Sequence, residues 1–470
     1  MLPRCYSGGT WYWDWAEHYC RSRLFAEQGD QYTAWGPYRL PARPPLVNVV
    51  LGFALSHFGS RMPVYQTSYA LLSALAVLPI ARFSCHWGAG RGGLWGGVLL
   101  LALNPMFVQN GTFSWSRGPT SYLILLTLWL YASTRRKPLQ PGPIALAMGV
   151  GALSLLGHYS AGPYLIILAG HLLARWVRGR FAGTRALLMG ASAAGMILVP
   201  WFAWSFATFG WQTTMGNNSS VATISNLSRA NYVAMAGHNL FDSLYPTILA
   251  PEYREMFRQE RLAGLIRDRL FVMYQTNLWA ALTLTNLVAL FSLLCLRPFV
   301  AKSARKGGWI FWLVFMSLVS VLGIAVHGPK EDRSGLAHIC LQPLVFLTLA
   351  WLGSILGNAR RMAKAVWIGA TVVESGAVLA LHFYVQSLVL VEVGRTDSGW
   401  VQFDPAAGLS HHTQLNWGLK IMNQITFLGD AVGSAAPGVW IALAVLLTVL
   451  IVRCWCTGTA ANRNLPSARS

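Results

Sequence analysis

Long apolar runs separated by short polar connections make up most of the chain. The runs reach roughly 17–25 residues, the length that a helix needs to cross about 30 Å of hydrocarbon. They lack the two-residue alternation over about 10 residues that is typical of barrel strands. Backbone in lipid must be hydrogen-bonded within helices or a closed barrel, so the pattern predicts an all-α polytopic transmembrane bundle. About eleven spans are expected, near 64–84, 93–109, 118–134, 143–158, 160–177, 186–208, 276–296, 309–327, 336–356, 365–391 and 434–456.

Three long polar stretches interrupt this pattern and are expected to carry short helices. Segment 46–58 is apolar but too short to cross comfortably, so we interpret it as an interfacial or re-entrant helix. The predicted organisation is a first loop 1–63, spans 64–208, a large loop 209–275, spans 276–391 with a short charged loop 327–338, a loop 392–433, a last span 434–456 and a tail 457–470.

Composition supports a lipid environment for this chain. Its residues are 54% hydrophobic and only 11% charged, and the mean hydropathy is +0.44. Soluble globular proteins carry about 25% charged residues. The apolar runs therefore read as membrane spans rather than as the core of a soluble domain.

The charges divide between the two faces of the predicted bundle. Basic residues, such as Arg135, Arg136 and Lys137, fill the connections on one face, which contain no Asp or Glu. The positive-inside rule makes this face cytoplasmic, with the N-terminus external and the C-terminus cytoplasmic, in the cell (inner) membrane. All of the 16 acidic residues except Glu374 then lie on the external side. The net charge of +20 is thus a topology signal, and it does not indicate nucleic-acid binding.

The first candidate for chemistry is the acidic, Trp-rich sequence WYWDWAEHYCRS near the start. Asp14 and Glu17 are three residues apart and would share one face of a helix. A partly dry aromatic setting raises the proton affinity of a carboxyl group, which suits a general base. An interfacial aromatic belt with solvated acids is the alternative interpretation.

The second candidate is the short external loop HGPKEDRSGLAH, residues 327–338. It carries Lys330, Glu331 and Arg333 on the side of the membrane where basic residues are otherwise sparse. Arg matches phosphate oxygens geometrically and Lys adds a point charge, so the loop suits a clamp for a lipid-linked phosphate. A self-neutralising charged turn explains the same residues.

Three further residues on the external side are candidates for substrate binding. Asn104-Pro105 should break a helix near its outer end, and Arg117 follows in an outward-facing polar turn. Arg43 precedes a rigid Pro-Pro, and His158 ends a span. A capped interhelical turn, a structural arginine and a satisfied interface histidine are the alternatives. No metal-ligand spacing is visible, and we expect no cofactor, although a divalent metal stays open.

Glu374 stands apart because it lies within a predicted span, where a carboxylate is costly. A proton-coupling role would favour a membrane transporter or flippase, which commonly shows inverted repeats. No repeat is detectable. A hydrogen-bonded structural role is the other interpretation.

Three motifs, in this order, resemble those of the membrane-embedded GT-C glycosyltransferases, specifically the protein O-mannosyltransferase-like group that uses polyprenyl-phosphate sugars. WDWAEHYCRS resembles the acidic first-loop motif of the family, RPPLVNVVLGFALSHFG the segment that follows it, and HGPKEDRSGLAHICLQPLVFLTLAW the late-loop pattern. The resemblance covers roughly residues 10–356. Here Trp15 and Ala16 separate the two acids, which are usually adjacent. The family also has a span before the first acidic loop, so we expect either an upstream start or a shortened chain.

The resemblance implies an inverting transfer on the external face, from a polyprenyl-phosphate-linked sugar to a lipid, glycan or protein acceptor. Asp14 would accept the acceptor's proton and Glu17 would orient an acceptor or a basic partner. Lys330, Arg333 and Arg117 would stabilise the leaving phosphate. A ligase or polymerase of lipid-linked glycans is a competing interpretation, distinguished by a lipid diphosphate donor and late-loop basic catalysts.

Overall fold

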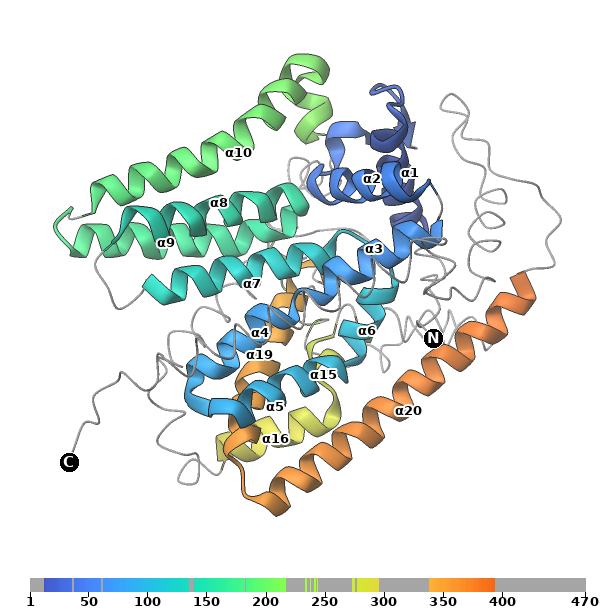
Figure 1. The fold of residues 1–470 in the computed structure, drawn as a ribbon, viewed down its shortest axis with the longest axis vertical. Helices are drawn as coiled ribbons and strands as arrows, with labels where there is room; N and C mark the ends of the chain where they lie inside the picture. Colours follow the sequence, from blue (N-terminus) through green and yellow to red (C-terminus); the bar gives the residue numbers. More distant parts are fainter. Residues whose placement is uncertain are drawn as a thin grey trace.

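A computed structural model describes residues 12–35, 38–60, 62–134, 139–181, 183–216, 277–295 and 338–393, with isolated positions between 233 and 274. Regular structure in this part of the chain is helical except for one very short hairpin (Figure 1). The predicted all-α class is therefore confirmed for the described residues.

The first loop folds into two helices joined by the hairpin. The loop contains α1 (Tyr12–Glu27), β1 (Ala34–Trp35), β2 (Tyr38–Arg39), the 3₁₀ turn η2 (Leu40–Ala42) and α2 (Leu46–Phe58). The strands pair antiparallel, with Ala34 opposite Arg39. The short apolar helix expected over 46–58 is confirmed as α2.

The remaining elements form the helical body. They are α3 (Met62–Ala74), α4 (Val77–Ser84), the π-turn η3 (Cys85–Ala89), α5 (Gly90–Ala102), α6 (Pro105–Thr112), α7 (Arg117–Thr134), α8 (Pro141–Gly157), the 3₁₀ turn η4 (Tyr159–Ala161), α9 (Gly162–Arg178), α10 (Thr184–Trp211), the π-turn η5 (Gln212–Gly216), α15 (Leu278–Leu282), α16 (Leu284–Cys295), α19 (His338–Asn358) and α20 (Arg361–Val393).

Several of these helices can cross a bilayer. In the described part of the chain, four are long and apolar enough, and the bent pair α5–α6 makes a fifth if it counts as one span. The protein is therefore a multi-pass membrane protein. Each predicted span that falls on described residues coincides with helix, whereas 309–327 and 434–456 lie outside them. The total of about eleven spans and the orientation of the termini stay predictions.

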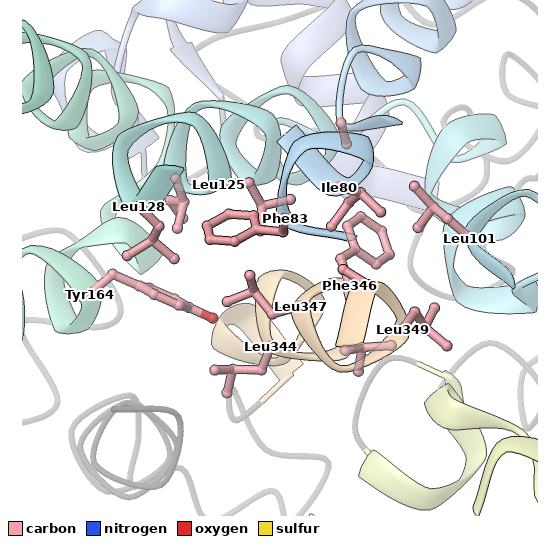
Figure 2. Packing of buried hydrophobic residues seen from close by; sticks show 14 of the residues in the cluster. Ile80, Phe83, Leu101, Leu125, Leu128, Tyr164, Leu344, Phe346, Leu347 and Leu349 are labelled. Carbon is pink, nitrogen blue, oxygen red and sulfur yellow. The ribbon is translucent and has the colours of Figure 1, made fainter. Parts of the chain in front are cut away.

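The core is organised around α19. In the apolar stretch of this helix 78% of the residues are buried, compared with 11% in the apolar stretches of α10 and α20. Figure 2 shows Phe83 and Leu125 packed over Leu347 of α19. Glycines let α5 approach this helix closely, because a Cβ on Gly96 would lie 2.6 Å from the carbonyl oxygen of Gly353. Small residues at such crossings are typical of helix packing in membranes.

The break expected at Asn104-Pro105 is confirmed. Helices α5 and α6 meet there at 58°. The Asn104 side chain caps α6 by accepting from the backbone N–H of Phe107 at 3.1 Å. Its Nδ2 donates to the backbone oxygen of Ala281 at 2.6 Å, so this break is bound to the end of α15.

A second break, at Thr283, was not expected from the continuous apolar run 276–296. Thr283 has φ 72°, which ends α15 and restarts the chain as α16. Glu374 of α20 occupies the new helix start: its Oε1 accepts from Leu284 N at 2.6 Å and its Oε2 from Thr285 N at 2.7 Å. A carboxylate here satisfies N–H groups that lack helical partners and complements the helix dipole. These contacts match the hydrogen-bonded structural role.

Replacing Glu374 with Ala should therefore destabilise the protein by about 2 kcal/mol, because two backbone donors lose their acceptor in a weakly polar environment. Glu374→Gln keeps one amide oxygen as an acceptor and should cost about half as much. Thermal unfolding in nanodiscs measures both. Equal melting temperatures for wild type and the Ala variant would contradict the capping role.

Candidate functional site

A buried ion-pair cluster anchors the first loop. Glu17 is 1% exposed and lies one turn before the fully buried Arg21 on α1. Its Oε1 accepts from Arg21 Nε at 2.9 Å and from Nη2 at 2.6 Å. Its Oε2 accepts from Nε of Arg43 at 3.3 Å. One carboxylate therefore holds two guanidinium groups from separate segments.

Arg21 also fixes the backbone that carries Arg43. Its Nη1 donates to the Leu40 carbonyl at 2.8 Å and its Nη2 to the Arg39 carbonyl at 3.1 Å. Arg43 itself is extended (φ −122°, ψ 139°), as expected of a residue before proline. The 3₁₀ turn and the following Pro-Pro therefore set the direction from which Arg43 approaches Glu17.

The proton affinity of Glu17 differs from the sequence expectation. Burial on its own raises the pKa of Glu17, but attraction by Arg43 and then Arg21 outweighs it and lowers the pKa to about 2. The expectation that a dry aromatic setting raises proton affinity is therefore wrong for Glu17, since cationic neighbours accompany the aromatic ones. Such a carboxylate is a weak base, and in this structure it is hydrogen-bonded to Arg21 and Arg43.

His18 links the first loop to the turn before α7. Burial lowers the pKa of His18 to about 4, so the imidazole is neutral near pH 7. Its Nδ1 lies 2.8 Å from Oδ1 of Asn48 on α2, and this geometry assigns the ring proton to Nδ1. Nε2 then faces the Ser116 hydroxyl at 3.4 Å as an acceptor.

Arg117, the first residue of α7, directly follows Ser116 in the sequence. Its guanidinium carbon is 3.2 Å from the ring centroid of Trp115, a cation–π arrangement. Arg117 is 2% exposed, so its side chain is buried within the protein. Two tyrosines of α3 hold the turn in place, with Tyr65 Oη donating to Ser114 O at 2.8 Å and Tyr69 Oη to Asn110 O at 2.9 Å.

His158 also contacts Trp115. The two rings meet edge to face, with centroids 6.3 Å apart. His158 ends α8, and its Nδ1 accepts from the backbone N–H of Ser160 at 3.0 Å, which caps η4. The side chain is buried, and it combines a structural cap with a place beside the Arg117 turn.

The structure thus brings four of the predicted residues into one region, namely Glu17, Arg43, Arg117 and His158. Asp14 belongs to α1, but its side chain lies outside the described residues, as do Lys330, Glu331 and Arg333. Sequence reasoning missed Arg21 and His18. The i,i+4 spacing of Glu17 and Arg21 is a signal that indicates the ion pair, whereas His18 gave none. Among the described residues, no three His, Cys, Asp or Glu side chains are grouped to hold a metal.

Comparisons with known proteins give a likeness in fold. No protein-family model matches the chain, and neither does any curated protein. Similar solved structures include ArnT from Cupriavidus metallidurans bound to undecaprenyl phosphate, at 12% identity and TM-score 0.45, covering 95% of this chain and 70% of that one. The same protein in its apo state has 12% identity and TM-score 0.47, with 97% and 71% covered.

Proposed function

We propose that the protein is an integral-membrane glycosyltransferase that moves a sugar from a polyprenyl-phosphate donor to an acceptor on the external face. The observation that carries the proposal is the convergence around Glu17: Arg43 pairs with it at 3.3 Å, and its neighbour His18 contacts the turn that presents Arg117. Segments distant in the chain thereby place Arg43 against the acidic helix and join that helix to the turn before Arg117.

Cationic groups in a largely dry setting suit an anionic ligand. In the described part of the site, one carboxylate faces two guanidinium groups of the first loop. Arginine forms bidentate contacts with phosphate oxygens and stays charged when buried. Arg43 and Arg117 would therefore bind the donor phosphate and stabilise the charge that it gains on departure. Lys330 and Arg333 are assigned the same role by the resemblance, with Glu331 beside them.

The reaction is a displacement at the anomeric carbon. An acceptor hydroxyl oxygen forms a bond to that carbon while the bond from carbon to the phosphate oxygen breaks. The pair of electrons leaves with the polyprenyl phosphate, and the hydroxyl proton passes to Asp14. Attack opposite the leaving group inverts the configuration. Glu17, with its depressed pKa, keeps its negative charge throughout and holds Arg43 in place.

The test is incubation of membranes that contain the protein with radiolabelled polyprenyl-phosphate sugars. Label should leave the donor and enter the lipid, glycan or protein fraction, and membranes without the protein give the background. Transfer from a lipid diphosphate glycan alone would instead support the ligase or polymerase interpretation. Movement of intact donor across the bilayer without bond cleavage would support a flippase. Either result would contradict the proposal.

A further inference from the structure

Tyr159 is a partly buried tyrosine at the first position of η4. Its hydroxyl oxygen is inaccessible to solvent and has no hydrogen-bond partner among the residues that the structure describes. Buried hydroxyl groups are nearly always hydrogen-bonded, and an unsatisfied one lowers the stability of the fold. An unpaired buried hydroxyl of this kind needs a functional explanation, such as a ligand that accepts its hydrogen bond.

The position of Tyr159 is tied to the site. It follows His158, whose ring caps η4 and faces Trp115. It also lies within electrostatic range of Arg43 and, more weakly, of Arg21. Burial raises the pKa of Tyr159 to about 12, and the two arginines only partly oppose this effect. The phenol therefore remains protonated at neutral pH and can donate a hydrogen bond.

The chemistry beside Tyr159 indicates which acceptor it would meet. The described carboxylate of the cluster, that of Glu17, is already engaged by Arg21 and Arg43. An O–H donor within electrostatic range of a guanidinium group matches an oxyanion that accepts hydrogen bonds from both groups, and such charge-assisted bonds are the strong ones. A phosphate oxygen fits this description.

We propose that Tyr159 binds the donor directly, with its Oη donating to a phosphate oxygen of the polyprenyl phosphate that Arg43 also contacts. This assignment rests on the proposed function and adds a ligand-binding residue to it. Binding of the phosphate would give the Tyr159 hydroxyl a hydrogen-bond acceptor.

The test is Tyr159→Phe, which removes only the hydroxyl oxygen. Because that oxygen has no partner without ligand, the variant should melt at the same temperature as wild type or higher. Its affinity for undecaprenyl phosphate in nanodiscs should fall about tenfold, as loss of one charge-assisted hydrogen bond implies. Undecaprenol, which lacks the phosphate, should bind both proteins equally.

Tyr131→Phe is the matched control. The Tyr131 hydroxyl lies 2.6 Å from His171 Nδ1, near the opposite end of α7 from Arg117. This variant should melt at a lower temperature than wild type and retain full affinity for undecaprenyl phosphate.

The outcomes separate the two ideas. Wild type that binds undecaprenyl phosphate, with a Tyr159→Phe variant that binds it equally, would overturn the role of Tyr159 and leave the proposed function standing. A Tyr159→Phe variant that melts well below wild type would also overturn it, since the hydroxyl would then serve the fold. Wild type that binds undecaprenyl phosphate no better than undecaprenol would contradict the proposed function itself.

Discussion

Replacing Asp14 with Asn is expected to slow sugar transfer by about 10²–10⁴-fold, the usual contribution of a general base. The amide keeps the size of the side chain and cannot accept the hydroxyl proton. Asp14 holds this role in the proposal because the other acids of α1 are engaged: Glu17 by Arg21 and Arg43, and Glu27 by Arg23. Initial rates with a radiolabelled polyprenyl-phosphate sugar measure the effect.

The loss of activity should appear in kcat and leave donor affinity unchanged, since the variant still presents Arg43 and Arg117 to the donor. Expression and melting temperature should match wild type. Glu27→Gln is the control on the same helix, where the pair with Arg23 is exposed, and it should transfer sugar at the wild-type rate. A fully active Asp14→Asn variant would remove Asp14 as the base and leave the proton acceptor to be found elsewhere in the site.

The hydrophobic pattern was sufficient to predict most of the helices. Segment 46–58 forms α2 with those bounds, because no proline interrupts its mostly apolar residues before Gly59 ends the helix. The break at Asn104-Pro105 was also predictable, since proline has no N–H and Asn is a favourable cap. In both places the local sequence alone determines where a helix begins and ends.

The break at Thr283 was not predictable in this way. Its cause is Glu374, about ninety residues further along the chain, which supplies the acceptors for the start of α16. Glu374 was recognisable as an unusual residue in a span, but its partner was not. A helix end that depends on a distant side chain leaves no signal in the residues around it.

The candidate site likewise has features that the local sequence predicts and features that depend on distant residues. The residue types at 14, 17, 43 and 117 pointed to acid and phosphate chemistry, and the resemblance supplied their order. Their arrangement depends on contacts such as His18 with Ser116, 98 positions apart. The pKa of Glu17 depends on Arg43, 26 positions away. Sequence therefore suggested the participants, whereas their charge states required the fold.

Replacing Glu17 with Gln is expected to destabilise the protein by about 3–5 kcal/mol, as removal of one partner from a buried ion pair usually does. The change leaves the guanidinium groups of Arg21 and Arg43 without their shared carboxylate in a cluster where Arg21 is fully buried. Arg43 would also lose its anchor, so donor affinity should fall as well. Thermal unfolding in nanodiscs measures the first effect and undecaprenyl phosphate binding the second.

The pH dependence gives a sharper form of this prediction. Because the folded pKa of Glu17 is depressed to about 2, its contribution is complete above the unfolded value of about 4.3 and is lost as pH falls toward 2. Wild type should therefore lose stability over this window more steeply than Glu17→Gln does. Glu27→Gln, which removes an exposed pair, should cost less than about 0.5 kcal/mol. Its effect on the slope should be in the same direction as that of Glu17→Gln but much smaller, because the pKa of Glu27 is also lowered but the pair is exposed to solvent. Equal slopes for wild type and Glu17→Gln would mean that the buried carboxylate is not ionised, and Arg43 would then need another anchor.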